Sequence, residues 1–81
     1  MFDAVENEDY VRVKQLLENG FNVNYKDKYG NTLLHEAVRH NYVPIIKLLL
    51  KYGANINVKN KFGETPLSLS REYDADLELY I

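Results

Sequence analysis

Between residues 43 and 52 the chain carries a broad apolar face with helical spacing. The apolar side chains of this stretch are Ile45, Ile46, Leu48, Leu49 and Leu50. Pro44 fits the first turn of such a helix, where a missing N–H has no intrahelical partner to lose. Gly53 stands where a left-handed residue would end the helix. The pattern therefore predicts a helix over residues 43–52.

A shorter helix is predicted immediately before it, over residues 33–40. Thr32 precedes an apolar run and suits the N-cap position, where its hydroxyl accepts a bond from an orphan backbone N–H. Asn41 can take the left-handed backbone that a tight turn between two helices needs. After Gly53 comes the polar, turn-rich segment ANINVKNKFG. It predicts an extended finger that turns back at Gly63 rather than a full strand.

The same arrangement of residues occurs twice, at an offset of 33 positions. The segment LLENGFNVNYKDKYGNTLL starts at Leu16, and LLKYGANINVKNKFGETPL starts at Leu49. Identical residues under this shift include Gly20 and Gly53, Asn22 and Asn55, Asn24 and Asn57, and Thr32 and Thr65. A fixed period of this length is the sequence signature of a repeat protein.

These residues resemble the ankyrin repeat, which reads D-x-x-G-x-T-P-L-H in a finger, then has a short helix, a second helix rich in I-V-x-L-L-L, and G-A-D-V-N. The matching segments are DKYGNTLLHEA from Asp27, IIKLLLKYGANIN from Ile45 and NKFGETPLSLS from Asn60. The resemblance implies an all-α repeat solenoid of ankyrin-type helix–turn–helix units with short β-turn fingers. It also implies one domain over residues 1–81, with approximate units 1–27, 28–60 and 61–81.

The chain departs from the family pattern at both ends and at three internal positions, where Leu33 replaces a proline, Ile46 a valine and Ser68 a histidine. Met1 aligns with Leu34, so the first unit begins at its first helix, and Ile81 aligns with Leu48, so the last unit stops within its second helix. Ser68 replaces the usual histidine, which alters a hydrogen bond. Since about three repeats are normally needed for stability, we expect marginal stability or self-association through the C-terminal end. A fragment of a longer array is an equal alternative.

Composition and charge narrow the classes of partner and the compartment. The 81 residues predict a single domain, and the formal net charge of -2 disfavours nucleic acid and anionic membrane as partners. The chain has no cysteine, which excludes a disulfide framework and a cysteine–zinc site. The N-terminal segment MFDAVENEDY is acidic and does not resemble a signal peptide. We therefore expect a cytoplasmic protein, or a nuclear one if the host is eukaryotic.

The segment HEAVRH, residues 35–40, is one residue longer than the zinc-protease motif HExxH. Residues five apart on a helix point about 140° apart, so His35 and His40 cannot face one ion. The chain has no further histidine and no evident nucleophile–base pair or phosphate loop, so we expect no enzyme, metal or cofactor. The resemblance instead implies that His35 bonds Thr32 and the backbone of the neighbouring finger.

The resemblance also assigns the variable residues of the units to one continuous face that binds another protein. These positions are Lys28, Tyr29, Asn31, Arg39, His40, Lys61, Phe62, Glu64, Glu72 and Tyr73. Aromatic and arginine anchors are what protein interfaces favour, which makes Tyr29 and Phe62 the strongest candidates. Lone surface aromatics are also common without any partner. The leading hypothesis is a non-catalytic binding module; the alternative is a structural element that stacks on a copy of itself.

Overall fold

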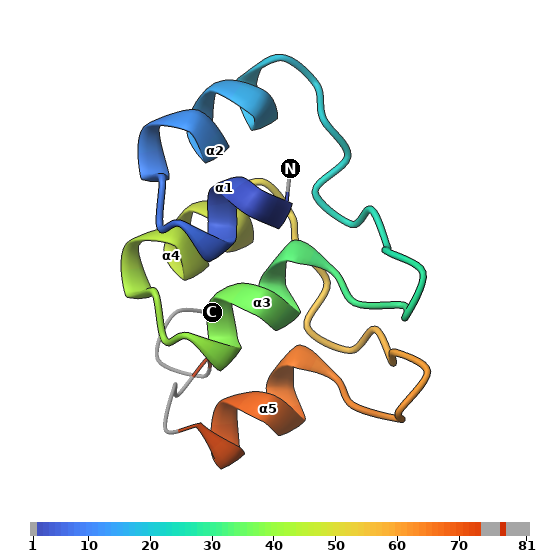
Figure 1. The fold of residues 1–81 in the computed structure, drawn as a ribbon. Helices are drawn as coiled ribbons and strands as arrows, with labels where there is room; N and C mark the ends of the chain where they lie inside the picture. Colours follow the sequence, from blue (N-terminus) through green and yellow to red (C-terminus); the bar gives the residue numbers. More distant parts are fainter. Residues whose placement is uncertain (1, 74–76, 78–81) are drawn as a thin grey trace.

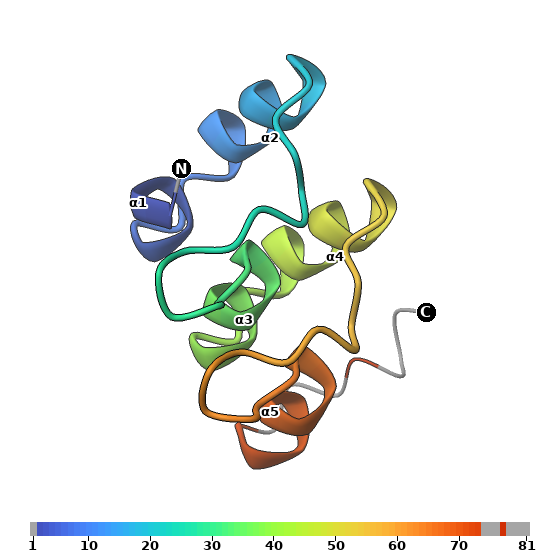
Figure 2. The ribbon, with the colours of Figure 1, turned by 90° about the vertical axis from the view of Figure 1, so that its right-hand side faces the viewer.

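The protein folds into two layers of short helices, with long loops extending from one side of the stack (Figure 1). The structure is a computed structural model that describes residues 2–73 and residue 77. Its helices are α1 (Phe2–Glu6), α2 (Tyr10–Glu18), α3 (Leu33–Arg39), α4 (Val43–Lys51) and α5 (Pro66–Glu72). Figure 2 shows α1, α3 and α5 following one another in one layer, with α2 and α4 in the other. Within the described part of the chain there are helices and loops and no strand, which confirms the all-α class.

Side-chain caps begin α2, α3 and α5, and the cap predicted at Thr32 is confirmed. Asp9 caps α2 by accepting a bond from the backbone N–H of Arg12 at 3.2 Å. Thr32 and Thr65 cap α3 and α5 through backbone N–H groups three residues further on. The observed helices are one residue shorter than predicted, since His40 and Tyr52 are C-cap residues rather than helical ones.

The helices α1, α2, α3 and α4 end in the same local geometry. Each is followed by a residue with positive φ: Glu8 (53°), Gly20 (91°), Asn41 (52°) and Gly53 (88°). After α4, the N–H of Gly53 donates to the carbonyl of Leu50 at 3.0 Å, and that of Ala54 donates to Leu49 at 3.0 Å. Such paired bonds satisfy the last helical carbonyls and reverse the chain within a few residues. The left-handed roles predicted for Asn41 and Gly53 are confirmed.

One apolar core runs through all the units, between the two layers. Its buried members come from every helix, and the residue Leu77 belongs to it. Leu33, Leu34, Ile45 and Ile46 have no exposed surface. Because a single unit cannot bury its apolar face alone, the units stabilise one another by stacking.

In residues 2–73 and 77, no helix has the length and apolarity that crossing a bilayer requires. Self-association through the C-terminal end was expected from residues 71–81. Most of that segment, positions 74–76 and 78–81, lies outside the described residues.

The loops after α2 and α4 are the predicted fingers, and they lie side by side (Figures 1 and 2). The first finger is residues 19–32 and the second finger is residues 52–65. The backbone N–H of Lys61 donates to the carbonyl of Tyr29 at 2.9 Å, which joins the two tips directly. Gly30 sits at this junction with φ +77°, and a Cβ there would lie 3.1 Å from the Cα of Asn60. The close approach of the two backbones therefore requires glycine at this position.

The repeat supplies a matched pair of substitutions to test this stacking. Gly63 has nearly the same backbone, with φ +75°, but a Cβ added there meets no atom within 4 Å. We expect Gly63→Ala to cost about 1–2 kcal/mol, the strain of a left-handed alanine. Gly30→Ala should cost at least about 1 kcal/mol more, because it also pushes the second finger away. Urea denaturation of both variants measures the difference, and equal losses would contradict close finger packing.

Candidate functional site

Both finger tips are built on the same side-chain-to-backbone turn. The Oδ1 atom of Asp27 accepts bonds from the N–H groups of Tyr29 and Asn31, both at 2.9 Å. Asn60 makes the equivalent pair of bonds in the second finger, also at 2.9 Å. Asp and Asn favour such turns because their short side chains can fold back onto the following backbone. These turns fix the position of the residue at each tip.

The residues fixed at the tips are aromatic, and their rings pack together in the open. The centroids of Tyr29 and Phe62 lie 6.3 Å apart with an interplanar angle of 29°. This spacing falls within the range of favourable aromatic pairs. The two residues nevertheless remain 46% and 68% exposed. The Nζ atom of Lys28 lies 5.1 Å from the centre of the Tyr29 ring, close enough for a cation–π contact.

Behind the tips, Arg39 ties α3 to both fingers. Its guanidinium donates to the carboxylate of Glu36 at 3.0 Å, to Glu64 at 3.1 Å and to the side-chain carbonyl of Asn31 at 3.2 Å. The side chain of Arg39 is 24% exposed. The positive charge of Arg39 is thus already paired within the molecule, and these bonds hold the side chain in place.

Asn31 does not lie on the exposed face where it was expected, because it is buried and only 6% of its surface is exposed. Its Oδ1 atom accepts a bond from the amide of Asn60 at 2.8 Å as well as the bond from Arg39. A buried amide must find partners, and the second finger supplies them. The structure therefore places Asn31 between the fingers as a tie, which corrects its assignment to the exposed face.

Glu64 occupies an intermediate position, with its side chain 35% exposed. Its carboxylate accepts a bond from Asn60 at 3.0 Å and pairs with Arg39. The Asn60 bond, and after it the Arg39 guanidinium, hold the pKa of Glu64 below its ordinary value. The carboxylate is therefore ionised at neutral pH and completes the network that Arg39 begins.

His35 is the second tie between the units, and it is fully buried. The N–H of Thr32 donates to its Nδ1 atom at 3.0 Å, so Nδ1 is the unprotonated nitrogen. Nε2 then carries the proton and donates to the carbonyl of Glu64, 3.0 Å away in the second finger. The predicted bonds to Thr32 and to the neighbouring finger are confirmed. In the last unit the hydroxyl of Ser68 accepts a bond from the N–H of Thr65, and the hydroxyl of Thr65 accepts one from the N–H of Ser68, so both bonds stay within one turn.

The burial of His35 also sets its protonation. Burial lowers the pKa of the imidazole from its ordinary 6.5, and this outweighs the Glu64 carbonyl, which acts in the opposite direction. The neutral ring is moreover the form that accepts from Thr32 at Nδ1. Protonation at that nitrogen would lose this bond and bury a charge.

His40, at the other end of HEAVRH, faces outward. Its ring stacks on Tyr42 with centroids 5.1 Å apart and an interplanar angle of 15°. Its Nε2 atom lies 3.6 Å from the carboxylate of Glu36. The two histidines thus have separate roles, and within the described residues no three His, Cys, Asp or Glu side chains group as a metal site.

Glu36 was overlooked as a site residue. It lies three residues before Arg39 and four before His40, a spacing that makes them neighbours on a helix surface.

The remaining predicted contact residues are exposed but divided between two regions. Lys28, Tyr29, Lys61 and Phe62 lie at the finger tips, while Glu72 and Tyr73 end α5. Because α5 leads away from the second finger, its C-terminal end lies about 10 Å along the helix axis from the finger. Figure 1 shows this separation. Binding by any of these residues stays a prediction.

Comparisons with known proteins identify relatives of this arrangement. Residues 16–70 match the family model described as ankyrin repeats (many copies). The ankyrin repeat protein FPV222 of Fowlpox virus (strain NVSL) is 43% identical over 46 residues, which are 57% of this chain and 6% of that protein. The crystal structure of the ankyrin repeat domain of Bcl-3, a member of the IkappaB protein family, superposes with a TM-score of 0.82 at 35% identity. That match covers 89% of this chain and 32% of the other, so the chain spans a minor part of both relatives.

The His35 tie makes stability depend on pH in a defined direction. The folded imidazole has a pKa below the ordinary 6.5, so below that pH the unfolded chain binds more protons. The contribution of His35 to stability is therefore fully present above pH 6.5 and is lost as the pH drops toward the folded pKa. Its slope is at most about 1.4 kcal/mol per pH unit for one proton.

We expect the His35→Gln variant to be less stable at pH 8 and to show a flatter profile between pH 8 and pH 5. Urea denaturation at several pH values measures both profiles. The matched control is His40→Gln, which makes the same substitution at the exposed histidine and leaves the His35 tie in place. A wild-type slope in His35→Gln would contradict the assigned role of the buried ring.

Proposed function

The chain belongs to the ankyrin repeat family, and on that basis we propose that it binds another protein through its finger tips and the adjoining helix ends. Ankyrin repeats are generally protein–protein interaction modules and are typically non-catalytic. The proposal accordingly involves no reaction and no cofactor. We also propose an intracellular location, which suits a chain without cysteine.

The observation that carries the proposal is the exposed, stacked pair of Tyr29 and Phe62. Large aromatic residues are enriched among the anchors that dominate interface energies. Here the backbone of each tip is already held by its turn, and the tips are joined by the Lys61 N–H bond. Association therefore requires little further ordering of the loops, which favours affinity.

The surroundings of the pair suggest the chemistry of the partner. Lys28 and Lys61 flank the rings and are exposed. An apolar partner patch bordered by carboxylates would match this combination of rings and ammonium groups. Arg39 contributes differently, because its pairing with Glu36 and Glu64 supports the second finger from behind.

The helix ends extend the proposed surface beyond the tips. His40, stacked on Tyr42, and the exposed pair Glu72 and Tyr73 are the further contact positions. Asn31 is left out of the contact set, since it serves from inside by linking Asn60 and Arg39. The proposed face is thus centred on the fingers, with outlying contacts on α3 and α5.

A double substitution tests the proposal. We expect Tyr29→Ala with Phe62→Ala to weaken capture of the partner from host extract by at least about thirtyfold, the effect of losing one interface hot spot of roughly 2 kcal/mol. Quantitative mass spectrometry measures capture, and calorimetry with the purified partner measures affinity. Val11→Ala is the control, because it removes an apolar side chain that is 64% exposed on α2. Unchanged capture by a folded double variant would refute the finger assignment.

A further inference from the structure

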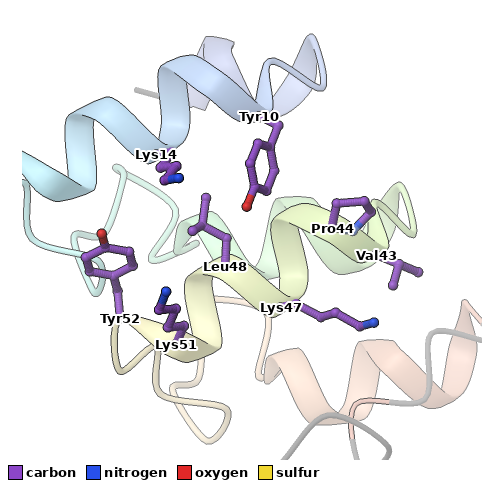
Figure 3. A pocket seen from close by; sticks show the side chains of 8 residues that line it. All are labelled: Tyr10, Lys14, Val43, Pro44, Lys47, Leu48, Lys51 and Tyr52. Carbon is purple, nitrogen blue, oxygen red and sulfur yellow. The ribbon is translucent and has the colours of Figure 1, made fainter.

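A recessed surface lies apart from the fingers, between α2 and α4 (Figure 3). It has a volume of about 370 Å³. Tyr10 and Lys14 line it from α2, and the remainder of its lining comes from α4 and the C-cap Tyr52. None of the residues proposed above for the finger face takes part in it. It is therefore a separate feature of the fold.

The floor of the recess is apolar and its ends are aromatic. Val43, Pro44 and Leu48 line it from α4, and Leu48 is also a buried member of the core, with 5% of its surface exposed. Figure 3 shows Leu48 at the centre, with Tyr10 reaching toward it from α2 and Tyr52 at the opposite end. The two tyrosines are 39% and 37% exposed. Such a site accepts one apolar side chain and offers hydroxyl groups to its polar neighbours.

Three lysines surround this floor, although the protein as a whole has a formal net charge of -2. Lys14 and Lys47 occupy equivalent positions, 33 residues apart, and Lys51 follows one turn later on α4. Among the carboxylates of the described residues, none lies within 4 Å of the ammonium group of Lys14 or Lys51. Cations gathered around a low-dielectric recess attract an anionic ligand.

We infer that this recess binds an acidic peptide segment of a partner protein, with one apolar side chain inserted over Leu48. Flanking carboxylates of the segment pair with Lys14 and Lys51. The size of the recess suits one side chain and the backbone beside it. A flat anionic membrane cannot reach the recessed floor, and the net negative charge of the chain disfavours nucleic acid. Two binding faces on separate layers would let the protein bridge two partners.

The test uses fluorescein-labelled peptides EEDLEED and EEDSEED with the intact chain. We expect the leucine peptide to bind at low salt and to shift amide resonances of α2 and α4 in heteronuclear NMR spectra. The serine peptide should bind several-fold more weakly because it leaves the apolar floor uncovered. Lys14→Gln with Lys51→Gln should weaken the leucine peptide at least about tenfold, through loss of two charge-assisted hydrogen bonds.

The matched control is Lys26→Gln with Lys59→Gln, which makes the same charge change on exposed lysines of the fingers. Its affinity for the peptide should stay near that of the wild type, as should that of Tyr29→Ala with Phe62→Ala. Thermal melts of each variant establish that it is folded. This comparison separates a failure of the recess from a failure of the finger face.

Several results would overturn the inference. Equal weakening by both lysine pairs would show that the peptide responds only to overall charge. Amide shifts confined to the fingers, equal binding of the two peptides, or no binding at low salt would each remove the recess as a peptide site. Binding of phosphatidylserine vesicles through Lys14 and Lys51, without peptide binding, would identify a membrane contact instead.

Discussion

The imidazole of His35 links two successive units, because it accepts a buried bond within its own unit and donates a part-buried bond across to the second finger. One nitrogen accepts from Thr32 at the start of α3, and the other donates to the Glu64 carbonyl in the second finger. A buried bond of this kind contributes modestly when made but is costly to leave unmade. The ring must therefore remain neutral and in one tautomer. That requirement fixes the distance between α3 and the second finger.

A second, polar network reinforces the same junction nearer the surface. Asn31 and Asn60 bond each other between the fingers, while Arg39 gathers Glu36, Asn31 and Glu64 around one guanidinium. Buried polar networks specify a single arrangement when every member is satisfied, as these members are in the described residues. The exposed rings of Tyr29 and Phe62 are consequently displayed on a rigid support. The hydrogen bonds between the fingers thus hold the exposed rings in place, and this connects the fold to the proposed binding.

The resemblance to the ankyrin repeat implied the tie through His35. The 33-residue period was sufficient to predict the helices and the threonine caps, because repetition shows which residues occupy equivalent places. It could not show how deeply each residue lies. Asn31 was therefore placed on the exposed face, although the second finger covers it. The recess around Leu48 was likewise missed, since it depends on how α2 and α4 pack side by side. Periodicity predicts neighbours within a unit, whereas depth and concavity arise from packing between units.

Nitrogen-15 NMR of the His35 ring tests the central claim most directly, because the tie requires one tautomer of one buried side chain. We predict that Nε2 carries the proton, that Nδ1 is unprotonated, and that this neutral ring predominates at pH 6.5, where an ordinary histidine is half protonated. A proton on Nδ1, or a ring that titrates with the ordinary pKa, would contradict it. Either result would mean that the second finger is held to α3 in some other way.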